Sequence, residues 1–175
     1  FNLKNPELTK LWSDGYKIIL FDPAGDPSAQ AIHDDLVPLM QNAALQLQTH
    51  TGLAFSYNPS PWYGDYGDTV FPSLIAVNLV DKADWPCSPT SHACAAVSTS
   101  AEGRVGSGRV ALRTDYVVKE LAKPDGAGMA ELHTTILHEF GHTLNLTHYN
   151  SLFDDGNGGT EWQTMASSTP GNSRD

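Results

Sequence analysis

The sequence predicts an α/β fold in which helices pack on a small twisted sheet. Short apolar runs rich in β-branched and aromatic residues, which are typical of strands, occur along the chain. Two longer segments instead carry apolar residues at helical spacing. The length of 175 residues suits one domain and is sufficient to bury a core. We therefore expect residues 1–175 to form a single domain of the α/β or α+β class.

The first strand and the first helix are expected in the N-terminal part of the chain. Residues 16–21 form an apolar run closed by an Asp-Pro pair, which predicts a strand. Apolar side chains recur at helical spacing over residues 28–49, which predicts a helix. Gly52 is a natural stop for this helix, and Pro38 is expected to kink it because proline removes one backbone hydrogen bond.

Four further strands and a second helix complete the expected order. The strands are predicted at residues 53–57, 73–80, 95–99 and 109–116. A loop rich in Pro, Gly, Asp and Tyr is expected over residues 58–72. A strong helix is predicted over residues 128–145, where apolar side chains form one continuous stripe. A loop rich in Gly, Asp and Asn and a short irregular tail follow it.

The charge balance excludes several classes of partner. The chain has 10 basic and 20 acidic residues and a formal net charge of −10. Nucleic acids and anionic membranes need a basic footprint, so we expect neither as a partner. No apolar run approaches the roughly 20 residues that span a bilayer, so we expect no membrane insertion. Low lysine content and a start at Phe1 predict a mature, secreted, monomeric protein whose signal and any propeptide have been removed.

The only two cysteines enclose a short loop with turn-forming residues. Cys87 and Cys94 either form a disulfide clip, remain free thiols, or supply one ligand pair of a metal site. A disulfide across so short a loop would contribute about 2–3 kcal/mol through chain entropy. It would therefore shape the local structure more than hold the fold.

The second predicted helix ends in a pattern that can bind a metal ion. His138 and His142 are four positions apart, so they lie on one helix face and can bind one ion. Glu139 is rotated by about 100° from His138 and can reach a water molecule on that ion. This arrangement is the physical basis of the HExxH pattern, which places two ligands and one base on a rigid helix.

A third ligand is expected from the chain that follows the helix. On a continuing helix, His148 would point about 120° away from His142, so the chain must turn sharply between them. Asn145 stands where a residue with positive φ is needed, and asparagine tolerates that conformation better than other non-glycine residues. Three imidazoles leave one tetrahedral position open, which is typical of catalytic zinc.

This segment resembles the extended zinc-binding consensus of the metzincin metallopeptidases, HExxHxxGxxH. It matches the consensus at His138, Glu139, His142 and His148, and it has Asn145 where the family has glycine. The family also has a Met-turn below the metal, and the Thr-Met-Ala sequence at Met165 is similar in kind. Both matrixin-like and snapalysin-like subfamilies remain open.

The resemblance implies a secreted zinc endopeptidase with a small mixed sheet, an active-site helix and a backing helix. Residues 1–148 would form the N-terminal subdomain, and residues 149–175 a short C-terminal subdomain in which Met165 lies under the ligands. Glu139 would accept the proton of the zinc-bound water and pass it to the leaving amine. The substrate would be an extended polypeptide pairing with an edge strand, for which we expect residues 95–99.

Two alternative functions remain open at this point. A gluzincin-type peptidase would use a distant glutamate, here Glu161, as the third zinc ligand in place of His148. A non-catalytic binding module would retain only a vestigial metal site. The presence of Glu139 argues against the second alternative, because loss of this residue is the simplest inactivating change.

Three weaker features each have two readings. The oxygen-rich loop after His148 either binds Ca²⁺ or is merely solvated, and its candidate ligands are Asp154, Asp155, Asn157 and Glu161. An aromatic group either lines a binding surface or caps a core, and its members are Tyr57, Trp62, Tyr63 and Tyr66. The remaining histidines are expected to be structural or exposed, and these are His33, His50, His92 and His133.

Overall fold

The computed structural model describes residues 15–99 and 105–148, together with the backbone of four short strands nearer the C-terminus. The described strands of the main sheet are β1 (Tyr16–Phe21), β2 (Phe55–Trp62), β3 (Leu74–Val80), β4 (Ala93–Thr99) and β5 (Val105–Arg113). The helices are α1 (Pro27–Thr51), α2 (Thr114–Leu121) and α3 (Ala127–Thr143), with short 3-10 helices η1 (Lys82–Asp84) and η2 (Pro124–Gly126). The four short strands are β6 (Leu152–Asp154), β7 (Thr160–Trp162), β8 (Ser168–Thr169) and β9 (Asn172–Ser173).

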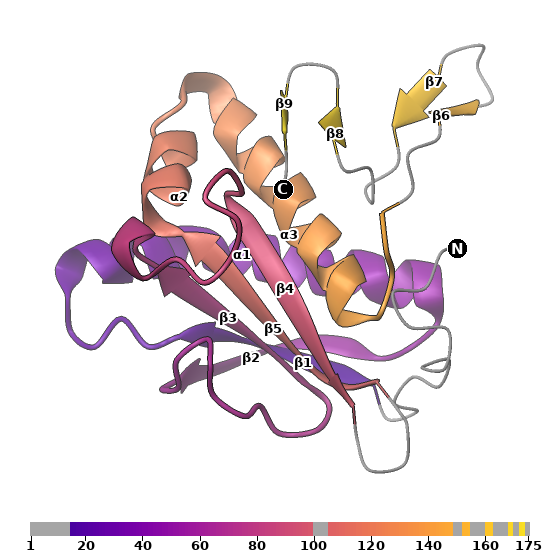
Figure 1. Cartoon of the computed structure of the whole chain (residues 1–175), viewed down its shortest axis with the longest axis horizontal. Coiled ribbons are helices and arrows are strands. Elements are labelled where there is room, and N and C mark those ends of the chain that lie inside the picture. The colour runs from indigo at the N-terminus through magenta and orange to yellow at the C-terminus, as the bar shows by residue number, and fades with distance from the viewer. Residues whose placement is uncertain are drawn as a thin grey trace.

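The main sheet has five strands in the order β2-β1-β3-β5-β4 (Figure 1). Strands β2, β1, β3 and β5 run parallel, and β4 pairs antiparallel with β5 at one edge. The expected mixed α/β class is confirmed, and the predicted run 95–99 belongs to this edge strand. Parallel neighbours require crossover connections, and α1 provides the one between β1 and β2.

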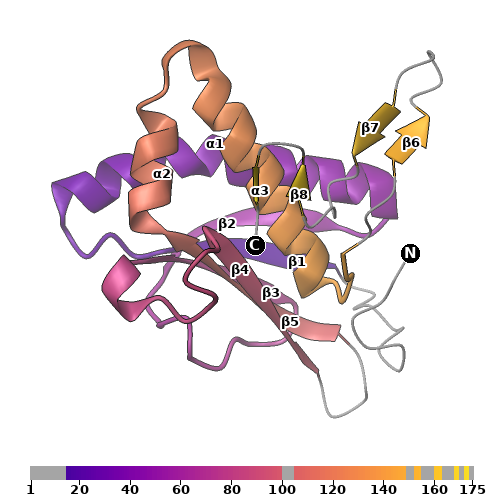
Figure 2. The same cartoon turned by 45° about the horizontal axis from the view of Figure 1, so that its top comes forward.

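The helices pack against one face of the sheet. Figures 1 and 2 show α1 and α3 crossing on the same side of the strands, and α3 contacts β4, β5 and α1. Alternate strand residues point into this layer, as the period of two requires. The largest fully buried side chains of the core include Ile18, Leu20, Leu36, Met40, Ile75, Leu112, Leu132, Ile136 and Phe140. The apolar stripe predicted for the last helix is therefore the face that meets the sheet.

Local signals explain the ends of α1. The Asp26 carboxylate accepts a hydrogen bond from the Ser28 amide (2.8 Å) at the N-cap, and a proline occupies the first turn. Gly52 is left-handed, with φ 73°, and its amide donates to the Gln48 carbonyl, so the expected stop is confirmed. The helix continues through Pro38.

Two predicted boundaries are wrong for identifiable reasons. The strand predicted over residues 109–116 ends at Arg113, and the following residues form α2, with Tyr116 and Val117 buried on it. A short apolar run fits either period, so periodicity alone could not separate strand from helix there. The strand predicted over residues 53–57 extends to Trp62, because β2 lies at a sheet edge where prolines without an amide hydrogen are tolerated.

A close approach fixes α3 on the sheet. A Cβ atom added at Gly108 of β5 would lie 2.3 Å from the Thr143 Cβ on the last turn of α3. Only glycine allows the helix to lie so near this strand. The end of α3, where the metal pattern lies, is therefore held directly against β5.

Within the described residues, no helix has both the length and the hydropathy that crossing a bilayer requires. The predicted C-terminal subdomain, residues 149–175 with Met165, lies outside the described residues apart from the backbone of β6 to β9.

Candidate metal centre

Three histidine side chains converge at the C-terminal end of α3. The Nε2 atom of His142 lies 3.1 Å from Nε2 of His138 and 3.1 Å from Nε2 of His148. The third side of this triangle, between His138 and His148, measures 3.2 Å. The structure therefore brings together the three ligands that the sequence predicts, and they are the one such group found among the described residues.

The turn after α3 brings His148 back to the helix. Asn145 adopts a left-handed conformation with φ 68°, as the sequence predicts. The Leu146 amide donates to the Gly141 carbonyl (3.0 Å), and the Asn145 amide donates to the His142 carbonyl (3.0 Å). These two bonds are the Schellman pattern, with asparagine in the position that glycine usually takes. The chain reverses within three residues, and His148 faces the preceding turn of the helix.

One backbone carbonyl fixes the protonation of a ligand. Nδ1 of His142 lies 2.8 Å from the carbonyl oxygen of Leu146, so Nδ1 carries the hydrogen and donates it. A neutral imidazole has one hydrogen, so its Nε2 then has a free lone pair facing the other two histidines. The same turn thus places His148 and orients His142, which is the second-shell arrangement that metal-binding histidines need.

The spacing of the three nitrogens fits a tetrahedral metal site. Zinc bonds of about 2.0–2.1 Å at tetrahedral angles separate the ligand nitrogens by roughly 3.3–3.4 Å. The observed separations of 3.1–3.2 Å are close to that value. Nitrogen donors without thiolates suit zinc, and they also suit other divalent transition metals. The residues therefore fit a three-coordinate protein site with an open position.

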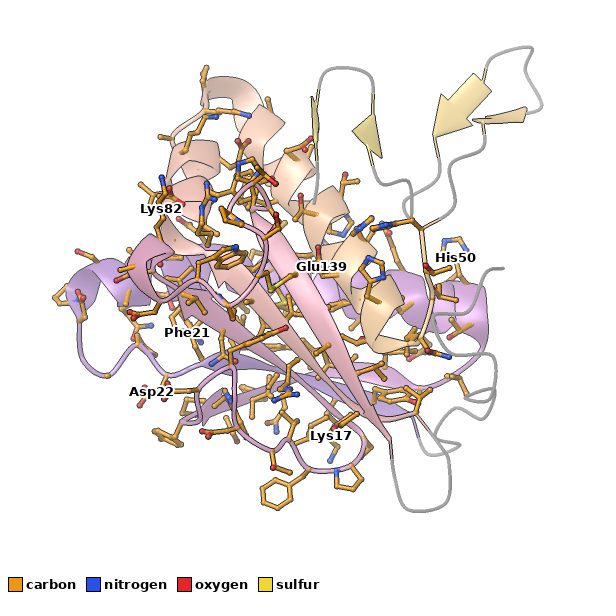
Figure 3. All side chains as sticks on the ribbon, in the orientation of Figure 1. Lys17, Phe21, Asp22, His50, Lys82 and Glu139 are labelled. Carbon is orange, nitrogen blue, oxygen red and sulfur yellow. A yellow bond between two sulfur atoms is a disulfide. The ribbon has the colours of Figure 1, made fainter. Side chains whose placement is uncertain are left out.

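Glu139 lies beside the three histidines. It is on the side of α3 that faces β4 (Figure 3), and only 1% of its surface is exposed. With His142 and His148 it lines a cavity of about 320 Å³ whose opposite wall includes Ala93 and Ala95 of β4. A carboxylate in this position can exchange a proton with a molecule bound between the helix and the edge strand.

The predicted disulfide between Cys87 and Cys94 is confirmed, so the free-thiol and metal-ligand alternatives are wrong. Both cysteines, with Ser88 and Ser91, line the same cavity as Glu139. Arg113 donates to the Ser91 carbonyl (2.9 Å) and holds this loop from below. The sequence indicated a local clip, and it gave no signal that the clip forms a wall of the site.

Tyr66 links the opposite face of β4 to this region. Its hydroxyl lies 3.8 Å from Cys94 Sγ. Burial raises the pKa of the Tyr66 phenol, Arg109 opposes that rise, and the Glu139 carboxylate adds to it. The side chains of the predicted aromatic group have separate environments: Trp62 packs in a small core with Ile19 and Ala76, whereas Tyr63 is 79% exposed.

Several predicted site residues lie outside the described part of the chain. Met165, Asp155 and Asn157 are not described, and Asp154 and Glu161 are described only as backbone in β6 and β7. The calcium hypothesis and the Glu161 ligand alternative therefore remain predictions. Of the other histidines, His92 is half-buried and stacks on Tyr116, rather than being exposed.

Comparison of the chain with protein-family models, with curated proteins and with solved structures gives no match in any of the three. The case for function therefore depends on the residues themselves.

Proposed function

We propose that the chain is a zinc-dependent endopeptidase of the metzincin type. The observation that carries this proposal is the triangle of Nε2 atoms from His138, His142 and His148, 3.1–3.2 Å apart, with buried Glu139 on the same helix. Three imidazoles and one adjacent carboxylate are the side chains that metal-assisted peptide hydrolysis needs.

Glu139 has the central catalytic role in this proposal. Zinc in such a site supplies a Lewis acid that activates a water molecule and polarises the scissile carbonyl. Glu139 accepts the proton of that water and then donates it to the nitrogen of the leaving amine. Its buried position beside His142 and His148 supports this role, because solvent competes little for the carboxylate there.

The edge strand β4 supports an extended polypeptide as substrate. Its outer edge has no partner among the strands of the five-stranded sheet, and Ala93 and Ala95 line the cavity with small side chains. A peptide laid along this edge would gain main-chain hydrogen bonds that do not depend on its sequence. The five-stranded mixed sheet with α3 at the site and α1 behind it agrees with the fold that the metzincin resemblance implies.

The disulfide supports an extracellular location. Disulfides persist in oxidising compartments and are rare in the cytosol. Cys87 and Cys94 enclose a wall of the proposed active site, so the site as described depends on such an environment.

The deciding experiment replaces the proposed base and leaves the metal ligands intact. In Glu139→Gln, we expect hydrolysis of an internally quenched peptide library to fall by about 10²–10⁴ or more, because general-base catalysis is lost. Zinc content measured by mass spectrometry should stay at the wild-type level. Glu131→Gln is the matched control, since it makes the same chemical change on α3 outside the cavity.

Other outcomes select the alternatives. Wild-type cleavage by the Glu139→Gln protein with bound zinc would refute the assigned base. If the wild-type protein binds zinc and cleaves none of the peptides, with or without chelator, the non-catalytic binding module is correct. If Glu161→Ala loses zinc and His148→Ala keeps it, the third ligand is the glutamate and the enzyme is of the gluzincin type.

A further inference from the structure

A second, larger cavity lies away from the histidines, where parallel strands end. Its volume is about 810 Å³, and its lining includes Phe21 and Asp22 at the end of β1 and Val80 and Asp81 at the end of β3. From β1 the chain crosses through α1 to β2, whereas from β3 it continues to β4 and β5 on the other side. The two connections diverge and leave a crevice, which is where ligands of open α/β sheets bind.

The cavity is strongly acidic and has an apolar floor. Five aspartates line it, namely Asp22, Asp26, Asp65, Asp81 and Asp84, and its lining contains no Lys, Arg or His. None of the five forms an ion pair with any residue that the structure describes. Apolar side chains between them include Phe21, Ile32 and Leu79. Such a surface attracts cations and also buries methylene groups.

A buried amide independently indicates a ligand with hydrogen-bond donors. Asn78 of β3 lines the cavity and is only 7% exposed. Its Nδ2 group donates to the Gly64 carbonyl (2.8 Å), which fixes the orientation of the amide, and its Oδ1 atom has no hydrogen-bond partner. A buried acceptor without a donor destabilises the fold, so a ligand N–H group is the missing complement.

The aspartates are too dispersed for a single metal ion. Within the described residues, only His138, His142 and His148 bring three ligand atoms within 4.8 Å of one another. The carboxylates instead surround a space that one small ion cannot fill. A ligand that matches them has several positive charges separated by aliphatic spacers.

We propose that this cavity binds an aliphatic polyamine, with its ammonium groups at the aspartates, its methylene groups on the apolar floor and one N–H group donated to Asn78. Free polyamines and lysine side chains of a peptide share this chemistry, and the experiment below separates them. The proposal is independent of the peptidase assignment.

The nearest cationic side chains of the protein are engaged elsewhere. Lys82, on the same 3-10 helix as Asp84, lowers the pKa of Asp115, although Arg113 is the stronger cause of that lowering (Figure 3). Arg109 donates to the carbonyls of Tyr66, Gly67 and Asp68 and holds their loop on the sheet. Neither side chain lines the cavity.

The test is calorimetric titration of the full chain with spermidine, at about 20 mM and about 150 mM salt. We expect saturable 1:1 binding that weakens with salt. The double variant Asp81→Asn/Asp84→Asn should bind about tenfold more weakly, since two exposed charge pairs are lost. The control Asp34→Asn/Asp35→Asn removes the same charge from α1 outside the cavity and should leave the affinity within about twofold.

Ligand analogues test the hydrogen bond and the source. Hexamethonium has the charges of 1,6-diaminohexane and no N–H donors, so we expect it to bind about tenfold more weakly. Tighter binding of tetralysine than of spermidine would support the peptide source of the same chemistry. Equal losses in the two double variants, equal affinity of hexamethonium and the diamine, displacement of spermidine by stoichiometric Ca²⁺, or no saturable binding of either polycation would each overturn the proposal.

Discussion

The metal centre and the acidic cavity occupy the same fold and differ in how their side chains are held. In the metal centre, a helix and one tight turn bring three nitrogens to a single point. In the acidic cavity, five carboxylates from separate connections surround about 810 Å³. Fixed nitrogen donors select one small ion, whereas dispersed charges select a ligand by its length and charge. The two regions share one connection, because Pro86 lines the acidic cavity and Cys87 lines the metal-site cavity.

The largest expected effect separates the two regions by their ligands. Replacing His138, His142 or His148 by alanine leaves two nitrogens at the site, so zinc affinity should fall more than about 100-fold, beyond the loss from second-shell changes. Spermidine affinity should not change, because no histidine lines the acidic cavity. Zinc competition with a chromophoric chelator measures the first effect. His50→Ala, on the exposed end of α1, is the control, and an equal loss there would contradict the assignment.

The next effect tests how firmly α3 is held on the sheet. In Gly108→Ala, the new methyl group meets Thr143 Cβ at 2.3 Å, so either α3 or β5 must move. Overpacking of this kind should lower the free energy of unfolding by about 2–3 kcal/mol. Zinc affinity should fall with it, because His142 lies next to Thr143. Urea unfolding measures the change.

A second glycine supplies the control for that prediction. An alanine Cβ at Gly67 meets nothing within 4 Å, so Gly67→Ala should change stability by less than about 0.5 kcal/mol. If both variants lost equal stability, the close approach of Gly108 and Thr143 would not be what holds the helix.

The metal centre could be predicted from the sequence because it is local. His138 and His142 are related by helix geometry alone, and the need for a reversal before His148 identified Asn145 as the turning residue. Each inference involves fewer than three turns of chain, where backbone geometry dominates. The disulfide was open between alternatives for the opposite reason. Thiol pairing depends on where two side chains point, which spacing does not determine.

The acidic cavity could not be predicted because it depends on strand order. Asp22 follows β1, Asp65 lies between β2 and β3, and Asp81 follows β3. Nothing in their spacing shows that the connections after β1 and β3 diverge. The helix α2 was missed for a different reason, since Tyr116 and Val117 continue the apolar run of β5 and only burial on two sides distinguishes them.

A smaller effect isolates the turn that completes the metal centre. Asn145→Ala and Asn145→Gly both delete the side chain, but alanine pays about 1–2 kcal/mol for the left-handed conformation and glycine does not. Zinc should therefore bind about tenfold more weakly to the alanine variant than to the glycine variant. Spermidine titration of both variants is the control and should give one affinity. Equal zinc affinities would show that φ at this position does not place His148.

The smallest expected effect lies in the loop between the two regions. Burial lowers the pKa of His92, with further lowering by Arg113 and Lys119 against smaller opposition from Asp115 and Glu120. The unfolded chain therefore binds a proton more readily than the folded protein, so stability contributed by neutral His92 is present above about pH 6.5 and is lost as the pH falls toward the lowered value.

His92→Phe keeps a ring against Tyr116 and removes the titration, so its unfolding free energy should depend less on pH between about 7.5 and 5.5 than that of the wild type. Urea unfolding at several pH values measures the difference. Zinc loss at low pH is common to both proteins and cancels in the comparison. Burial also lowers the pKa of His133, so a residual slope of the same sign should remain in the variant. A steeper slope in His92→Phe would mean that protonated His92 stabilises the folded loop, through Asp115 and Glu120, instead of destabilising it.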